Sequence, residues 1–173
     1  MLVKYPSELL HTKSVSAIDN LSESEIRDIV SRMRKEAWQV GGFAISAIQI
    51  GEPYTILGFF SFKRNEYIWI VDPEIISTNG SSVIKEGCLS IPGYFWNIKR
   101  PAKATISYTD LDGTPRVRTF TEVIARAIFH EMDHFDGILI PDFMNSDQLN
   151  LFNQHYKESS HIDEYDAPEL DAN

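Results

Sequence analysis

Residues 130–134 read His-Glu-Met-Asp-His, the stretch whose residue types and spacing point most directly to chemistry. Side chains four residues apart lie on one face of a helix, so His130 and His134 can bind one metal ion together. Glu131 lies beside the first histidine and can reach a water molecule at that ion. The alternative is a helix with two surface histidines. Apolar residues within 123–128 favour a buried face instead, where an unpaired polar ring is costly.

A catalytic metal site of this kind needs a third protein ligand and an open position for water. Cys88, the only cysteine of the chain, lies in residues 86–93, whose glycines and proline predict a turn that presents a thiolate to a cleft. A lone cysteine is more often a small buried hydrophobic residue, but the neighbouring motif favours a ligand here. The other candidates lie in the acidic end of the chain: His155, Glu158, His161 and Glu164.

One helix is predicted from Ser22 to about Gln39. Ser22 and Glu25 have the spacing of a capping box, in which each residue satisfies a free backbone N–H of the other. Apolar residues then recur at helical spacing up to residue 37. The glycines at 41–42 should end this helix.

The helix that carries the histidines is predicted to run from about Glu122 to Phe135. Thr119 and Glu122 have the spacing of a second capping box, and Gly137 follows the last apolar residue. A shorter helix is predicted around residues 146–157.

Two hairpins are predicted between the helices. Residues 54–62 and 67–71 are rich in aromatic and β-branched residues and are separated by four polar residues. Residues 103–109 and 116–120 alternate in polarity around the turn sequence 110–113, Asp-Leu-Asp-Gly. Hairpins without β-α-β crossovers indicate an α+β class, with antiparallel β-sheets packed around a central helix that bears the HExxH motif.

The composition of the chain predicts one globular domain, residues 1–157, followed by an acidic and disordered tail, residues 158–173. The chain has 173 residues, 43% of them hydrophobic, and its 16 basic and 25 acidic residues give a formal net charge of −9. Six acidic residues and no lysine or arginine lie in the tail, namely Glu158, Asp163, Glu164, Asp166, Glu169 and Asp171. This balance argues against DNA binding, which needs a cationic face.

No apolar stretch approaches the length of a membrane-spanning helix or a signal peptide. The sequence therefore predicts a protein without membrane contact, in a reducing, cytoplasmic compartment.

Three segments together resemble the signature motifs of the peptide deformylases. They are Gly-Phe-Ala-Ile-Ser-Ala-Ile-Gln at 42–49, Glu-Gly-Cys-Leu-Ser at 86–90 and the motif at 130–134, in that family's order and at similar separations. The similarity covers most of the chain, to about Asp142. The chain departs from the pattern at Ala44, where the family usually has glycine, and in its acidic end, where bacterial members often carry a basic helix.

The resemblance implies a peptide deformylase-like fold and a hydrolase that removes the N-formyl group from the N-terminal formyl-methionine of nascent polypeptides, releasing formate. It implies one divalent metal ion, held by Cys88, His130 and His134. Fe²⁺ is expected as the native ion, and the nitrogen and sulfur ligands also accept Zn²⁺, Ni²⁺ or Co²⁺.

The same resemblance assigns roles in catalysis. Glu131 would take a proton from the attacking water and pass it to the departing amine. The side-chain amide of Gln49 and the backbone N–H of Leu89 would donate to the oxyanion on the formyl oxygen.

Further residues are weaker candidates for the substrate pocket. Glu86, or Asp133, would orient an imidazole, although Glu86 and Arg126 could instead be surface charges. Arg100 matches an arginine near the family's peptide-binding cleft. Some of the apolar candidates are most simply core residues. The pocket candidates are Gly42, Ala44, Ile45, Glu86, Gly87, Ile91, Arg100, Val123 and Ala127, of which Ile45, Ile91, Val123 and Ala127 are the apolar ones.

Two other functions share part of this evidence. A zinc endopeptidase of the HExxH type would use Glu131 and the two histidines but would require neither Cys88 nor Gln49. A non-catalytic relative would bind metal or formyl peptide without turnover.

The expected partners are N-formylmethionyl peptides and nascent chains. The protein is expected in the cytoplasm of a bacterium, or encoded by a virus that acts in one, rather than in an organelle. The acidic tail should be repelled by ribosomal RNA and makes ribosome contact doubtful.

Overall fold

The computed structural model describes the backbone of residues 1–159 and the side chains of residues 1–156. The acidic tail of the sequence analysis, residues 158–173, therefore lies almost wholly outside the described residues. In the described part no helix is both long enough and apolar enough to cross a membrane.

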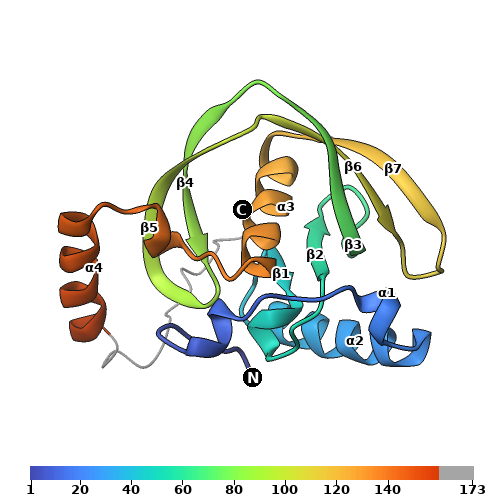
Figure 1. Cartoon of the computed structure of the whole chain (residues 1–173), viewed down its shortest axis with the longest axis horizontal. Helices are drawn as coiled ribbons and strands as arrows, with labels where there is room; N and C mark the ends of the chain where they lie inside the picture. The colour runs from blue at the N-terminus through green and yellow to red at the C-terminus, as the bar shows by residue number, and fades with distance from the viewer. Residues whose placement is uncertain (160–173) are drawn as a thin grey trace, which may run out of the picture.

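The larger sheet has five antiparallel strands in the order β1-β2-β3-β6-β7 (Figure 1). The two predicted hairpins, β2–β3 and β6–β7, are both confirmed. Strand β3 is longer than predicted, because it continues past Val71 through two register shifts and pairs with β6. The strands are β1 Ala44–Ser46, β2 Ile56–Ser61, β3 Glu66–Asn79, β6 Lys103–Thr109 and β7 Pro115–Thr121.

A second sheet consists of two strands, β4 Ser82–Cys88 and β5 Ile91–Arg100. The prediction of a turn over 86–93 is wrong in extent, because only Leu89 and Ser90 are turn residues and the flanks are strands. Gly87 was interpreted as a turn residue, but it lies within β4. Its role is steric, since a Cβ atom there would lie 2.7 Å from the ring of Phe95 on the paired strand.

The three predicted helices are confirmed as α2 Glu23–Gln39, α3 Glu122–Phe135 and α4 Ser146–Ser159. Glu25 accepts the Ser22 N–H at 2.8 Å as a capping box requires. The predicted Thr119 cap is wrong, because Thr121 is the N-cap and Thr119 lies in β7, facing Thr105. The short elements are η1 Glu8–His11, α1 Ala17–Asn20, η2 Ala47–Ile50 and η3 Ile140–Phe143.

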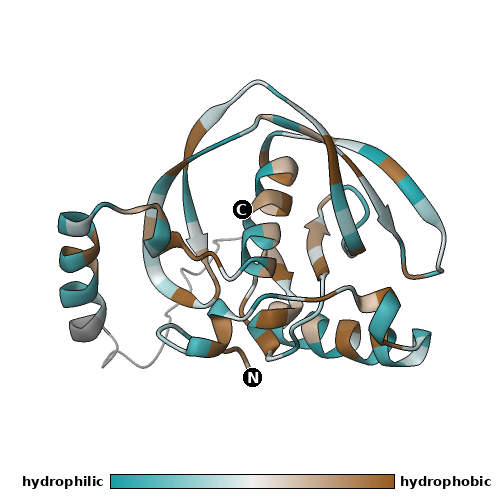
Figure 2. Cartoon of the chain, in the orientation of Figure 1, coloured by the Kyte–Doolittle hydropathy of each residue, from teal (hydrophilic) through white to brown (hydrophobic). Residues whose placement is uncertain are grey.

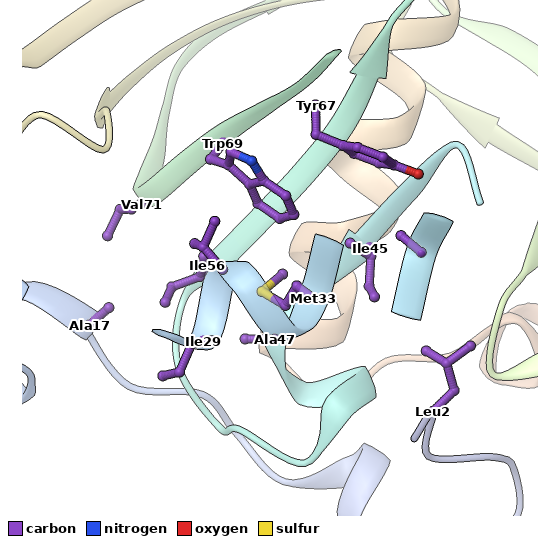
Figure 3. Close-up of a cluster of buried hydrophobic side chains, with 12 residues drawn as sticks. Leu2, Ala17, Ile29, Met33, Ile45, Ala47, Ile56, Tyr67, Trp69 and Val71 are labelled. Carbon is purple, nitrogen blue, oxygen red and sulfur yellow. The ribbon is translucent and has the colours of Figure 1, made fainter. Parts of the chain in front are cut away.

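Two helices cover opposite faces of the larger sheet. Ile56 of β2 packs in a cluster with Ile29 and Met33 of α2, and Figure 3 shows these side chains meeting. The next residue, Leu57, points to the other face and packs with Ile128 of α3. Figure 2 shows apolar and polar residues alternating along α2 and α3, as expected for helices with one buried face.

A third cluster joins the smaller sheet to η1 and α4. It contains Cys88 and Ile98 of the β4–β5 hairpin, Leu10 of η1 and Phe152 of α4. Helix α3 lies at the centre of the molecule, between the larger sheet and this hairpin (Figure 1). The α+β class, with antiparallel sheets around the helix that bears the HExxH motif, is confirmed.

Candidate metal centre

Cys88, His130 and His134 meet at one point in the interior. Cys88 ends β4, and the two histidines lie one turn apart on α3. Their ligand atoms all lie within 4.8 Å of one another, and the Cys88 Sγ lies 3.3 Å from the His134 Nε2. The structure thus brings the three predicted ligands together. Of the alternative third ligands, His155 is exposed on α4, and the other three lie beyond the described side chains.

Each imidazole is oriented by a hydrogen bond at its Nδ1. His130 lies 3.1 Å from the Glu86 carboxylate, and His134 lies 3.1 Å from the Ile138 carbonyl. Both partners accept, so each Nδ1 carries the proton and each Nε2 is left for a metal. Glu86 thus takes the place beside an imidazole that the sequence analysis allowed for Glu86 or Asp133.

Glu86 belongs to a buried network of charges. Arg100 donates to it from Nε at 2.6 Å and from Nη2 at 2.9 Å, and Arg126 donates at 2.5 Å. Arg100 also binds Asp133, at 2.8 Å. The interpretation of Glu86 and Arg126 as surface charges is therefore wrong, because both side chains are buried.

The network keeps Glu86 ionised. Burial alone would raise the pKa of Glu86, but hydrogen bonds with His130 and Arg100 outweigh it and lower that pKa to about 2. A carboxylate in this state accepts the His130 N–H at every pH at which the protein is expected to work.

The electrostatics of the three ligands favour a cation. Burial raises the pKa of the Cys88 thiol, but the imidazoles of His134 and His130 outweigh it and hold that pKa well below its usual value. A thiolate with two imidazole nitrogens is a donor set that borderline divalent ions accept. The Cys88 Sγ and the His134 Nε2, 3.3 Å apart, have about the separation of two ligands of one tetrahedral ion. The residues present therefore fit a metal.

Glu131 is buried, with 2% of its surface exposed, and its Oε2 has no hydrogen-bond partner among the described residues. Burial raises the pKa of Glu131, against the opposing effect of the two imidazoles. A buried oxygen without a partner is costly, so such a group in a native site points to a ligand that it meets. Glu131 interacts electrostatically with Cys88 and the two histidines, so a ligand held by these three residues is the one that its oxygen would meet.

Gln49 is held in one orientation from η2. Its Oε1 accepts the Ser46 N–H at 3.0 Å, so its Nε2 must point the other way, toward the Cys88 Sγ at 3.4 Å and the Ser90 Oγ at 3.2 Å. Leu89 follows Cys88 directly and packs over Gly42, where a Cβ atom would lie 2.8 Å from its Cδ1. Both predicted oxyanion donors therefore lie next to the ligand Cys88.

The weaker candidates separate into core and surface. Ile45, Ile91 and Ala127 are buried, as their interpretation as core residues predicts, but Ile45 faces α2 and not α3. The same prediction for Val123 is wrong, since it lies in the first turn of α3 and is 59% exposed. Gly87 lies under Phe95, Ala44 is half-buried on β1, and Arg100 is engaged by Glu86 and Asp133.

Two contributors were missed by the sequence analysis. Ser46 fixes the Gln49 amide, and Ser90 accepts from it. Both lie inside the segments that carry the motifs. Their polar side chains among apolar neighbours are the signal that could have identified them.

A carboxylate with one unpartnered oxygen beside three metal-binding atoms is suited to moving the proton of a water molecule. This combination is typical of metal-dependent hydrolases. Residues 1–150 match the polypeptide deformylase family, and the chain belongs to that family. The family removes the N-formyl group from nascent peptides, so the predicted activity, a hydrolase of formyl-methionyl peptides, is confirmed.

Individual relatives agree with this assignment. The chain is 30% identical over 164 residues to a peptide deformylase of Helicobacter pylori. This alignment covers 91% of this chain and 92% of that protein. The crystal structure of a Legionella pneumophila peptide deformylase matches with a TM-score of 0.84 at 24% identity, covering 92% of this chain and 94% of that one. A probable peptide deformylase of Synechococcus phage S-SSM7 matches with a TM-score of 0.78 at 22% identity, covering 83% and 99%.

Proposed function

We propose that Cys88, His130 and His134 hold one divalent ion and that Glu131 carries the proton in deformylation. The observation that carries the proposal is the buried Glu131 Oε2, which has no partner among the described residues and lies beside the three ligands. A bound ion lowers the pKa of a water molecule and polarises the formyl carbonyl.

The residues of the chain perform the remaining steps. Glu131 accepts a proton from the attacking water at its carboxylate. It then gives that proton to the nitrogen of the departing amine as the bond from the formyl carbon to this nitrogen breaks, so the products are formate and a peptide whose N-terminal methionine has a free amine. The Gln49 Nε2 and the Leu89 N–H donate to the formyl oxygen while negative charge accumulates there. Because Ser46 holds the Gln49 amide, this donor is already oriented before the reaction.

The test of the proton carrier is Glu131→Gln, which keeps the shape but accepts no proton. We expect it to retain one metal ion per chain and to release formate from formyl-Met-Ala-Ser at least about 100-fold more slowly. Glu66→Gln, at an exposed glutamate of β3, is the matched control. A Glu131→Gln rate near that of the unsubstituted protein would reduce Glu131 to a structural neighbour, and no formate from the unsubstituted protein would favour the non-catalytic relative.

The native ion is proposed to be Fe²⁺. Oxygen oxidises ferrous iron more readily than Ni²⁺ or Co²⁺, so the Fe²⁺ form should lose activity in air, while the Ni²⁺ or Co²⁺ form should keep it. The half-lives of the metal-exchanged forms in air measure this. Equal half-lives would contradict iron held by the Cys88 sulfur.

The proposed partners are nascent chains that begin with formyl-methionine. Residues 1–157 form the catalytic domain that binds them, in the cytoplasm of a bacterium. The phage relative supports a virus-encoded origin as a variant of this proposal.

The acidic residues 158–173 should add nothing favourable to ribosome binding, because ribosomal RNA is also negatively charged. A chain ending at Lys157 should deformylate free peptide at the full rate and bind ribosomes at low salt no more weakly. Weaker ribosome binding would contradict this proposal.

A further inference from the structure

The loop that carries the proposed oxyanion donor is not in the conformation that two-residue hairpins favour. Leu89 and Ser90 join the paired residues Cys88 and Ile91. Two-residue loops usually adopt type I′ or II′ turns, which need a positive φ at the first loop residue. Within residues 1–159 the non-glycine positions with positive φ are Asn65, Asp72 and Glu122. The loop at Leu89 is therefore neither a type I′ nor a type II′ turn, and contacts from other segments add to what holds its shape.

The N-terminal segment supplies those contacts. The Lys4 ammonium donates to the Leu89 carbonyl at 2.7 Å, and the Tyr5 N–H donates to the Ser90 carbonyl at 2.9 Å. The neighbouring Val3 N–H donates to the Gln49 carbonyl at 2.8 Å. Figure 1 shows this segment beside the tip of the β4–β5 hairpin. Three successive residues thus tie together the two segments that provide both proposed oxyanion donors.

We propose that Lys4 is a positioning residue for catalysis: its ammonium fixes the Leu89 carbonyl and thereby the direction of the Leu89 N–H. The inference rests on the oxyanion role proposed for Leu89. Peptide units are rigid planes, and the N–H and C=O of Leu89 belong to two planes joined at its Cα. The hairpin holds the far end of the first plane at Cys88, and Lys4 holds the second plane, so the Leu89 N–H between them has little freedom to rotate.

The chemistry of the contact suits this role. A hydrogen bond from a charged donor is stronger than one between neutral groups. Among the described residues no carboxylate forms an ion pair with Lys4, and its ammonium interacts with the Leu89 carbonyl and electrostatically with Cys88, next to it in the chain. Lys13, further along the same segment, differs, since it pairs with Asp136 at 3.3 Å in an exposed position.

The test compares Lys4→Met, which keeps the length of the side chain but loses the donor, with Lys4→Arg, which keeps a charged donor. Lys13→Met is the control. The measurements on the metal-loaded protein are metal content, kcat and KM for formyl-Met-Ala-Ser, and amide hydrogen exchange over residues 88–91. We expect Lys4→Met to lower kcat about tenfold or more, because displaced donors stabilise the transition state poorly. KM should change less than about twofold, exchange in the loop should accelerate, and Lys4→Arg should restore much of kcat.

Several results would overturn the proposal. They are an unchanged kcat in Lys4→Met, unchanged loop exchange, or a loss that Lys4→Arg does not restore. An equal loss in Lys13→Met would show a general effect of charge. If the unsubstituted protein released no formate, the proposed function would fail, and the exchange data would still decide whether Lys4 holds the loop.

Discussion

The β6–β7 and β4–β5 hairpins differ in what holds their turns. The turn of β6–β7 is stabilised by its own residues: the Asp110 side chain accepts the Asp112 N–H at 3.1 Å, and Gly113 takes a φ of 80°. Its strands pair without a register shift. The register of β4–β5 shifts between Gly87 and Cys88, and its loop is held by the N-terminal segment and Gln49.

This difference follows from function. A hairpin without a role in chemistry can adopt the turn that its own sequence prefers. The β4–β5 loop must instead present a thiolate and a backbone N–H in fixed directions, so contacts from distant segments replace local turn preference. Positioning is then a property of the assembled fold, and substitutions should act very differently in the two hairpins.

The largest contrast is expected from truncating one side chain in each hairpin. Cys88→Ala should reduce bound metal from about one ion per chain to nearly none and abolish activity, because two imidazoles alone hold a divalent ion weakly. His134→Ala should do the same. Val117→Ala, at an exposed residue of β7, should leave metal and activity unchanged. Metal analysis of protein purified without oxygen is the measurement, and one ion per chain in both ligand variants would exclude this site.

A smaller effect is expected from giving β4–β5 a turn stabilised by its own residues. Replacing Leu89-Ser90 by Asn-Gly favours a type I′ turn and should keep or raise the melting temperature. It should lower kcat about tenfold to 100-fold, because the N–H at position 89 turns away from the formyl oxygen. Leu89→Ala, which keeps the backbone conformation of the loop, should lower kcat much less. Full activity of the Asn-Gly variant would show that the direction of this N–H is unimportant.

A contrast in stability, rather than in turnover, is expected from one acidic residue in each hairpin. The folded pKa of Glu86 is lowered to about 2, so its stabilisation is complete above the unfolded pKa near 4.5 and is lost as pH falls toward 2. A shift of this size corresponds to about 3 kcal/mol. In protein from which metal has been removed with a chelator, Glu86→Gln should therefore lower the free energy of unfolding strongly at pH 7. Below pH 5, the free energy of unfolding measured with urea should depend less on pH in this variant than in the unsubstituted protein.

Asp112→Asn is the counterpart in the other hairpin. The pKa of Asp112 is also lowered to about 2, by hydrogen bonds with Asp110 and Thr114, but its side chain is exposed to solvent. Solvent screens such interactions, so this variant should change stability little. Equal urea midpoints for Glu86→Gln and the unsubstituted protein at pH 7 would contradict a stabilising role of the buried network.

The sequence by itself determined the elements that local rules govern. The Ser22 capping box and helical periodicity predicted α2, and the turn residues at 110–113 predicted the β6–β7 hairpin. The spacing of His130 and His134 predicted two ligands on one face of α3. These features depend on residues within a few positions of one another, so a single sequence contains the information.

The tertiary structure alone decided which distant residues meet. Gly87 and the residues after it indicate a loop locally, yet packing against Phe95 makes this stretch part of a hairpin. Glu86 and Arg126, 40 residues apart, pair with each other in a buried network, which no local pattern reveals. The contact of Lys4 with Leu89 spans 85 residues. Long-range pairs depend on how whole elements pack, and so they appear only when the chain is folded.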